Sequence, residues 1–423
     1  MNRALDKIEL FLLCFTAFMI PIHIKLTSVS IALLMLVALL KKENYKRFIS
    51  LLKNYKYYLL CSPLILSILG LYHTEYFPEA KSQIEIVVSL AIFPFIFTSF
   101  KSNKIKFSRE YVFSFFVVSS LFAYFICMAY ALPAFAESYD TNVFLYSAFS
   151  MLIRGPHHLS YCIFFSFVLV AFSFTNKFDL FIRRDKSIRI FKIVLLILFL
   201  IFIFQLSSKI TILLLVLFSI SLLIYMFVAK QIGIKKILLV FLSFIVLSGS
   251  MLFLPKIRAR FDVMLNSVKE FDKDSRNRPI ESTELRFSAI EAALSIIRDN
   301  FWIGVGTGDL STEMSNYYKE NNSQGAYINH ISPHNQMLRT FAMYGVIGFS
   351  LLVGIFIMLF YSGLKDKNFL LITWTLFMLA LFNVEDMLMI QDGIIMFSFF
   401  SSYFLFYRKR NTVVIRNEGY GKE

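Results

Sequence analysis

The sequence predicts an all-α integral membrane protein of about 12 transmembrane helices, with a large and partly helical loop on one side. Hydrophobic residues make up 57% of the 423, and the mean hydropathy is +0.66. Apolar runs long enough to cross a bilayer, about 17–25 residues each, recur along the chain. One long polar stretch, from about 255 to 335, interrupts them. These observations exclude a soluble fold and favour one membrane domain over residues 1–423.

The apolar runs favour helices over a membrane barrel, whose strands need only about 9–11 alternating residues. They lie near residues 8–22, 26–40, 57–72, 84–100, 111–131, 158–175, 190–206, 210–229, 234–254, 336–362, 368–383 and 387–407. The first run ends at Pro21 without a small-residue cleavage site, so we expect a retained helix and not a signal peptide. The second largest connection spans roughly 132–157.

The net charge of +15 follows a topological pattern. Basic residues crowd alternate connections: Lys41, Lys42, Lys46, Arg47, Lys53 and Lys56; Lys101, Lys104, Lys106 and Arg109; Lys177, Arg183, Arg184, Lys186, Arg189 and Lys192; Lys230, Lys235 and Lys236; Lys365 and Lys367; Arg408, Lys409 and Arg410. The positive-inside rule then predicts that both termini and the short tail 408–423 are cytoplasmic, and that the long loop faces outward. Since that loop is nearly neutral, we expect no nucleic-acid partner.

The four cysteines, Cys14, Cys61, Cys127 and Cys162, all fall within or at the ends of apolar runs. We expect them to be small packing residues, not a disulfide framework or a metal site. The pair Asp272-x-Asp274 has a spacing used to hold a metal on nucleotide sugars, but it lies on the predicted outer side, where such substrates are not supplied. We expect no metal and no cofactor.

The long loop contains one predicted helix, from a cap at Thr283 to about Asp299. Such an amphipathic helix would lie on the membrane surface or pack over the mouth of the bundle. The glycine run 304–308 then predicts a tight turn; without a βαβ context it is no dinucleotide fingerprint.

The loop ends in Ser332-Pro333-His334-Asn335. Serine is a preferred N-cap and proline favours the first helical position, so the pattern predicts His334 in the first turn of the next helix. Helix N-termini favour anions, and a neutral imidazole there can act as a base. The alternative is simply a polar helix start at an interface.

Other ionisable residues are predicted at the same outer level. Lys209 opens an apolar run after Ser208, and Arg286 lies in the first turn of the loop helix. The remaining candidates are Arg154, His157, His158, His330, Asn335, Glu385 and Asp386. Each alone is more often structural, because groups at segment ends can reach water. Their convergence on one face is what indicates a site.

At these residues the chain resembles the O-antigen ligase and polymerase family of bacterial inner-membrane proteins. The resemblance rests on Arg286 opening a helix, the Trp302-Ile303-Gly304-Val305-Gly306 turn, the His334-Asn335 pair and Gly345. It is strongest over about 284–350. The family usually has Ser-Arg where this chain has Ser208-Lys209, so one cation has lost the bidentate phosphate geometry of arginine.

The resemblance implies a metal-independent glycosyltransferase that works at the periplasmic face, with an undecaprenyl-pyrophosphate-linked glycan as donor. It implies that His334 is the catalytic base and that Arg286, with Lys209 at the position of the family's arginine, binds the pyrophosphate. Arg154, predicted at the same outer level, is a further candidate for binding the pyrophosphate. His157, His158, His330, Asn335, Glu385 and Asp386 would support them. The acceptor would be lipid A–core oligosaccharide for a ligase, or a second lipid-linked glycan for a polymerase. A transporter of lipid-linked sugars is a third alternative, which predicts broken helices and charges near the membrane centre.

Overall fold

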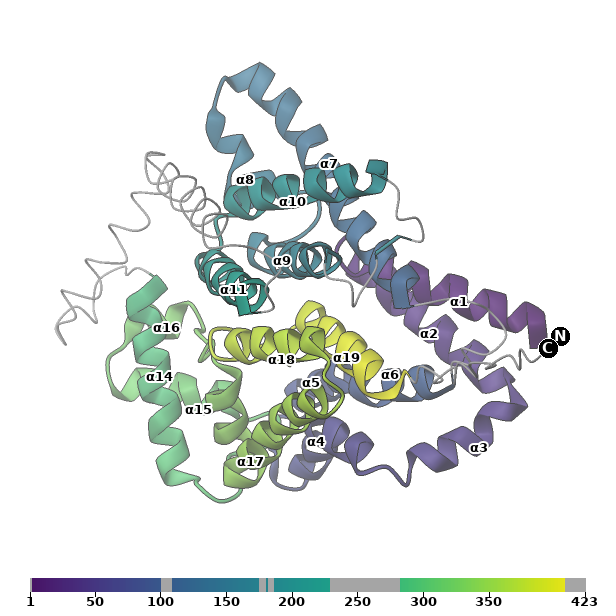
Figure 1. Cartoon of the computed structure of the whole chain (residues 1–423). Coiled ribbons are helices and arrows are strands. Elements are labelled where there is room, and N and C mark those ends of the chain that lie inside the picture. The colour runs from purple at the N-terminus through teal and green to yellow at the C-terminus, as the bar shows by residue number, and fades with distance from the viewer. Residues whose placement is uncertain (1, 100–108, 175–179, 182–185, 229–281, 408–423) are drawn as a thin grey trace.

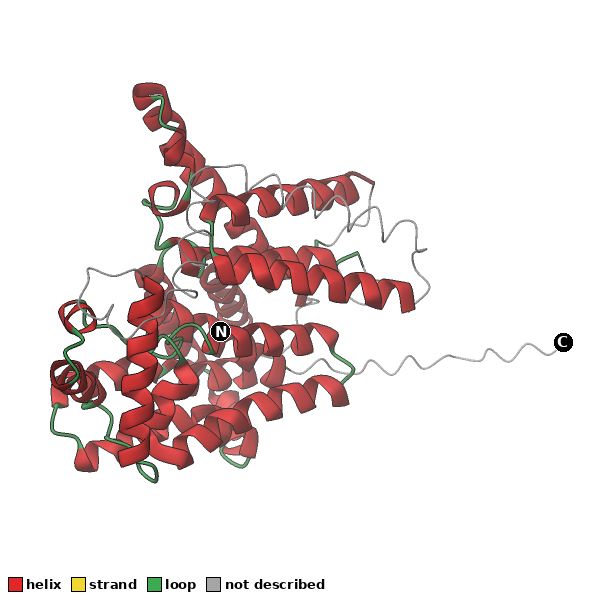
Figure 2. Cartoon of the chain, turned by 90° about the vertical axis from the view of Figure 1, so that its left-hand side faces the viewer, coloured by secondary structure: helices red, strands yellow, loops and turns green. Residues whose placement is uncertain are grey.

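The computed structural model describes residues 2–99, 109–174, 180–181, 186–228 and 282–407. Within these ranges the chain forms α-helices, short 3-10 helices and loops, and no strand occurs there (Figure 2). The all-α prediction is therefore confirmed for the described part of the chain. The predicted run 234–254 and the pair at 272 and 274 lie outside it.

The first half of the chain supplies α1 (Asn2–Met19), α2 (Ile24–Leu40), α3 (Lys42–Leu51), α4 (Tyr55–Leu69), η1 (Gly70–His73), α5 (Phe77–Val87), α6 (Ser89–Ser99), α7 (Arg109–Ser138), η2 (Thr141–Phe144), α8 (Tyr146–Phe149), α9 (Pro156–Phe172), α10 (Lys186–Leu206) and α11 (Lys209–Val228). The second half supplies α14 (Ser282–Asp299), α15 (Leu310–Glu320), α16 (Gln324–Ile328), α17 (Gln336–Lys365), α18 (Phe369–Phe382) and α19 (Gln391–Phe406). Every predicted apolar run inside the described ranges is mostly helical.

Helix length supports fewer spans than the sequence predicts. Among the described residues, five segments are long and apolar enough to cross a membrane: Tyr55–His73, Phe77–Ser99, Tyr111–Ser138, Lys186–Leu206 and Gln336–Lys365. The bent pair α2–α3, with 105° between its helices, would make a sixth. Shorter apolar helices account for other predicted runs, among them α9 and α18. The described residues thus support a membrane protein with several spanning helices.

Two connections contain more helix than predicted. α7 continues through Pro133 to Ser138, and η2 and α8 follow, so much of the predicted connection 132–157 is helical. In the long loop, α14 confirms the predicted helix within two residues, whereas α15 and α16 fall in the polar stretch before His330, for which we predicted no helix. Their formation gives α14 a surface to pack against.

The helices pack around a core rich in aromatic side chains. The ring centroid of Phe165 in α9 lies 4.6 Å from that of Trp374 in α18 and 4.8 Å from that of Phe400 in α19. The Trp374 indole also donates a hydrogen bond to Ser401 Oγ at 3.0 Å, which satisfies its buried N–H group. This cluster fixes the three helices whose ends carry candidate site residues. The four cysteines are free and buried, as predicted for packing residues.

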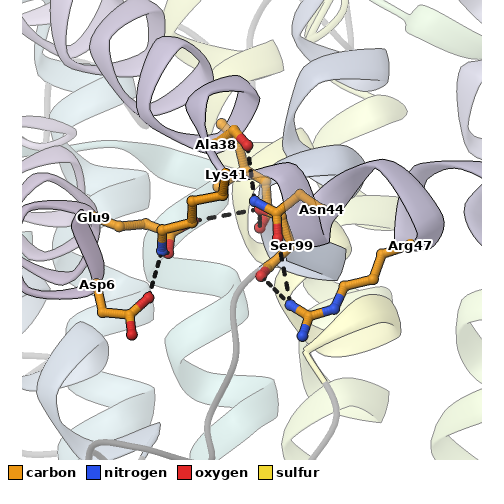
Figure 3. Close-up of polar contacts among 8 residues, drawn as sticks. Asp6, Glu9, Ala38, Lys41, Asn44, Arg47 and Ser99 are labelled. Atoms are coloured by element: carbon orange, nitrogen blue, oxygen red, sulfur yellow. Dashed lines mark hydrogen bonds and ion pairs between the residues drawn. The ribbon is translucent and has the colours of Figure 1, made fainter. Parts of the chain in front are cut away.

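A polar network joins α1, α2, α3 and α6 (Figure 3). The buried Lys41 ammonium lies between two carboxylates of α1, 2.7 Å from Asp6 Oδ1 and in contact with Glu9 Oε2. Arg47 donates to the carbonyl oxygen of Ser99, whose hydroxyl contacts Glu9 at 3.4 Å. A buried ammonium is tolerated only when it is paired in this way, so the network fixes how these helix ends meet.

The loop helices α14, α15 and α16 gather at one end of the bundle, and α1 begins at the opposite end (Figure 1). α14 runs across the ends of the bundle helices (Figure 1). It buries Ala289, Ala292 and Ile296 in a cluster with Met314 of α15 and Met343 of α17. Of the two predicted placements for α14, the structure therefore supports packing over the bundle.

Candidate functional site

His334 lies just before α17 and not within it. The helix begins at Gln336, and its N-cap is Asn335, whose side-chain oxygen accepts the Leu338 N–H at 3.1 Å. His334 itself has a φ of 45°, in the left-handed region. The predicted Ser332 cap is therefore wrong by three residues, because asparagine is an equally good N-cap and the chain reverses at His334. The imidazole is left free to point away from the helix axis.

The imidazole of His334 meets a carboxylate from the turn between α18 and α19. His334 Nδ1 lies 3.6 Å from Glu385 Oε2, with a third of the His334 side chain exposed and Glu385 mostly buried. The other carboxylate oxygen accepts a hydrogen bond from the buried Tyr161 hydroxyl at 3.3 Å. Tyr161, from a distant part of the sequence, thus orients the acid that faces the histidine.

Charge around Glu385 keeps this carboxyl ionised. Burial is the largest single effect and would raise its pKa, but His334, His158 and Arg286 together outweigh it, so the pKa of Glu385 lies below the usual 4.5. Arg286 is exposed on α14, so its guanidinium can reach both water and this cluster. The structure therefore brings together four of the predicted site residues: His334, Glu385, His158 and Arg286.

Asp386 fixes the turn to the start of α17. Its Oδ1 accepts the Asn335 N–H at 3.1 Å, and its Oδ2 lies 3.3 Å from Arg339 Nη1. The side chains of Asp386 and Arg339 are 5% and 10% exposed. Asn335 also donates its side-chain amide to the Asn383 carbonyl at 3.2 Å. Asp386 and Asn335 consequently hold the segment that presents His334, and do not face the open side of the site.

Sequence reasoning missed Arg339 and Tyr161. Arg339 lies inside the predicted apolar run 336–362 and was not a candidate site residue. An arginine one turn into such a run costs free energy unless it is paired. That cost was a signal for a buried acidic partner, which the structure shows to be Asp386. Tyr161 carried no such signal, since a tyrosine among apolar residues is ordinary core.

Arg154 and His158 extend the cluster from the start of α9. Arg154 Nη1 lies 3.1 Å from Asp392 Oδ1 in the first turn of α19, and Nη2 donates to the Ile20 carbonyl. The His158 ring packs edge-on against Tyr161, with centroids 5.8 Å apart. Both Arg154 Nε and His158 Nε2 are buried without a hydrogen-bond partner among the described residues. Arg154 is thus held by protein contacts on two of its nitrogens.

His157 links α9 to the residue before Lys209. Its Nε2 lies 3.0 Å from the Tyr146 hydroxyl, and its Nδ1 lies 3.4 Å from Ser208 Oγ. Lys209 is the first residue of α11 and is exposed. His330 is separate from these contacts: it is exposed, and its ring lies 6.3 Å from Tyr327 within the loop. The predicted supporting role of His330 stays a prediction.

The glycine turn pairs with a break in α17. Val305 N–H donates to the Ala342 carbonyl at 2.9 Å, Gly306 N–H to Met343 at 3.0 Å, and Val346 N–H to Phe301 at 2.9 Å. Gly345 has φ 62° and ψ −162°, which interrupts the helical ladder. This backbone-to-backbone contact is close, because a Cβ on Gly345 would lie 2.2 Å from the Trp302 carbonyl oxygen. The turn predicted from the glycines is therefore bonded to the break in α17, and we call this backbone contact between 301–306 and 342–346 the glycine joint.

The next residues of the loop join the N-terminal half of the chain. Asp309 Oδ1 accepts the N–H groups of Glu75 and Tyr76, each at 3.0 Å, just before α5 begins. Thr307 N–H donates to Thr74 Oγ1 at 2.9 Å, and the Thr307 hydroxyl donates to the Ser67 carbonyl at 2.9 Å. A short loop segment therefore supplies hydrogen-bond partners to backbone that precedes it by more than half of the chain.

Residues 193–353 match the family model described as O-antigen ligase. This match supports an O-antigen ligase family assignment. No curated protein matches it. The O-antigen ligase segment contains Lys209, Arg286, His334 and both glycines of the joint. Glu385, which faces His334, and Asp386, which binds Asn335, lie beyond it.

The family assignment supports a ligase- or polymerase-type function in surface polysaccharide synthesis. Chemically, the cluster offers an imidazole that can take a proton, a carboxylate that orients it, and an exposed guanidinium for an anion. In the described ranges, no group of three or more His, Cys, Asp or Glu gathers as metal ligands would.

Proposed function

We propose that this protein transfers an undecaprenyl-pyrophosphate-linked glycan to lipid A–core oligosaccharide at the periplasmic face of the bacterial inner membrane. The observation that carries the proposal is the His334–Glu385 pair, 3.6 Å apart, with Arg286 in electrostatic reach. The assignment of residues 193–353 to the O-antigen ligase family supports the same chemistry.

In the proposed reaction the acceptor hydroxyl attacks the anomeric carbon of the donor glycan. Its proton passes to the imidazole of His334 as the new C–O bond forms. The bond between the anomeric carbon and the pyrophosphate oxygen breaks, and its electron pair leaves with undecaprenyl pyrophosphate. Displacement from the opposite face inverts the anomeric configuration.

In this scheme, cationic side chains stabilise the negative charge on the leaving pyrophosphate, which a metal ion does in other glycosyl transfers. Arg286 is exposed and can hold two phosphate oxygens at once, whereas Lys209 offers a point charge. Fixed positive groups that face the leaving pyrophosphate stabilise the charge that develops on it. Arg154 is paired with Asp392, so it contributes positive charge near the site and does not bind the pyrophosphate directly. The scheme needs no metal and no cofactor.

The glycolipids of a strain that lacks the gene test this function. We expect a gel of its surface glycolipids to lose the long ladder, while long lipid-linked glycan accumulates and the complemented strain recovers the ladder. A core that carries a single repeat unit would instead identify a polymerase acting on two lipid-linked glycans. An unchanged profile would contradict both forms of the proposal.

The proposed reaction requires the loop helices to face the periplasm and both termini to face the cytoplasm. Because the four native cysteines are buried, single introduced cysteines can report topology without removing them. We expect Gln324→Cys, on exposed α16, to react with a membrane-impermeant maleimide on intact cells, and Lys46→Cys, exposed on α3, to react only after permeabilisation. The opposite pattern, or equal labelling, would overturn the topology.

A further inference from the structure

The turn at the glycine joint exposes three large apolar side chains in succession. Phe301, Trp302 and Ile303 are 42%, 72% and 62% exposed. The only other tryptophan of the chain, Trp374, is fully buried. Exposed apolar groups of this size cost free energy in water, about 1.5–3 kcal/mol for each side chain that could be buried. Something apolar therefore covers this turn in the native setting.

The turn is rigidly placed at the break in α17. The Phe301 carbonyl accepts the Val346 N–H, and the Phe301 ring lies 5.4 Å from the Phe341 ring. The Trp302 backbone contacts Gly345 too closely to admit a side chain there. The level of the turn along α17 is consequently fixed at residue 345.

The part of α17 after this break has the length of a membrane span. From Val346 to Lys365 it contains about 20 residues, which at about 1.5 Å each cover about 30 Å, the thickness of a bilayer hydrocarbon core. Its exposed side chains include Ile347, Ile357, Tyr361 and Leu364. An apolar outer surface that ends in a lysine is typical of a lipid-facing helix.

The exposed turn is continuous with this lipid-facing surface. The Val346 N–H donates a hydrogen bond to the Phe301 carbonyl, and the next residue, Ile347, is exposed on the helix. In the N-terminal half, Tyr72 of η1 and Phe77 of α5 are 96% and 59% exposed, and the Thr307 N–H donates to Oγ1 of Thr74, which lies between them in the sequence. Tryptophan and tyrosine prefer the boundary between headgroups and acyl chains, where one part of the ring stays wet. The aromatic groups therefore mark one level on the surface of the protein.

We propose that Phe301-Trp302-Ile303 inserts into the outer headgroup–acyl boundary of the bilayer and anchors the loop helices to the lipid surface. The partner is the phospholipid interface itself, and the inference does not rest on the transfer reaction. It places Gly345 at the outer boundary and the α17 segment 336–344 beyond the 30 Å core that the following span crosses. The paired Arg339 then lies outside the hydrocarbon, where its charge costs least.

Tryptophan fluorescence of the full chain in phospholipid vesicles tests this placement. The emission of Trp302 is the difference between the wild-type protein and Trp302→Phe, since Trp374 is the only other emitter. We expect lipids brominated near the headgroup end of the acyl chain to remove more of this difference signal than lipids brominated near the chain end. The remaining Trp374 emission, shielded by protein, serves as the internal control for quenching.

Two outcomes would overturn the proposal. Quenching of the difference signal by aqueous acrylamide with no loss from brominated lipid would place the turn in water. Protection from both quenchers would mean that protein covers it, as in a second copy of the chain. The Trp302→Phe substitution lies on an exposed side chain, and equal elution of both proteins as single species in detergent confirms that it leaves the fold intact.

Discussion

Replacement of His334 by alanine is expected to lower glycan transfer by about 10²–10⁴-fold, the usual contribution of a general base. The variant should still accumulate in the membrane, because the side chain is a third exposed and Asn335 and Asp386 hold the start of α17 without it. Transfer is measured with purified protein in vesicles, from a lipid-pyrophosphate-linked glycan to added lipid A–core acceptor.

A second histidine at the outer end provides a matched control. His73 is exposed at the end of η1, and His73→Ala should retain wild-type transfer. Glu385→Gln keeps the shape of the side chain but loses its negative charge, and should give a loss smaller than that of His334→Ala, since the base remains but is less well oriented. Full activity of His334→Ala with normal expression would remove the histidine from the mechanism.

The largest stability effect is expected for Gly345→Ala. Its φ of 62° and ψ of −162° fall in a region that only glycine populates freely, and the new Cβ would overlap the Trp302 carbonyl oxygen at 2.2 Å. Strain and steric overlap together should destabilise the protein by at least about 3 kcal/mol, because neither backbone can retreat without breaking the joint. The fraction that stays monodisperse in detergent after heating, measured by size-exclusion chromatography, reports the loss.

Gly354 lies nine residues further along the same helix and is the control for this substitution. A Cβ there would approach only Leu59 Cδ1, at 3.4 Å, and its backbone is helical. Gly354→Ala should therefore be neutral or slightly stabilising, within about 1 kcal/mol, because alanine is the better helix former. Equal heat sensitivity of the two variants would show that the contact at Gly345 contributes no more to stability than an ordinary helical glycine does.

The sequence predicted the helices well, because long apolar runs leave a membrane chain few other solutions. Apart from the unpredicted loop helices α15 and α16, its errors in helix position lie at helix ends. Ser332 and Asn335 are both good N-caps, and periodicity cannot choose between them; the choice depends on Asp386, which binds the Asn335 N–H from the far end of the next helix. The number of spans was harder still, since several apolar runs form helices of 14–17 residues that are short for a crossing.

The candidate site was predictable in composition and not in geometry. Arg286, His334 and Glu385 are visible in the sequence as polar groups at the ends of apolar runs. Which carboxylate meets the histidine is decided by tertiary contacts: Glu385 faces His334, whereas its neighbour Asp386 turns inward to Arg339. Two adjacent acids in one turn thus have different partners, and no local pattern distinguishes them.

The contact between Asp309 and the backbone before α5 affects the order in which parts of the chain can fold while it is being synthesised. The N–H groups of Glu75 and Tyr76 obtain this acceptor from a residue more than 230 positions later. Until Asp309 has been synthesised and has reached this turn, these two donors rely on water or on transient partners. The turn between α4 and α5 is therefore synthesised early but reaches its final hydrogen bonding late. A nascent chain truncated before Asp309 should leave this turn accessible to protease.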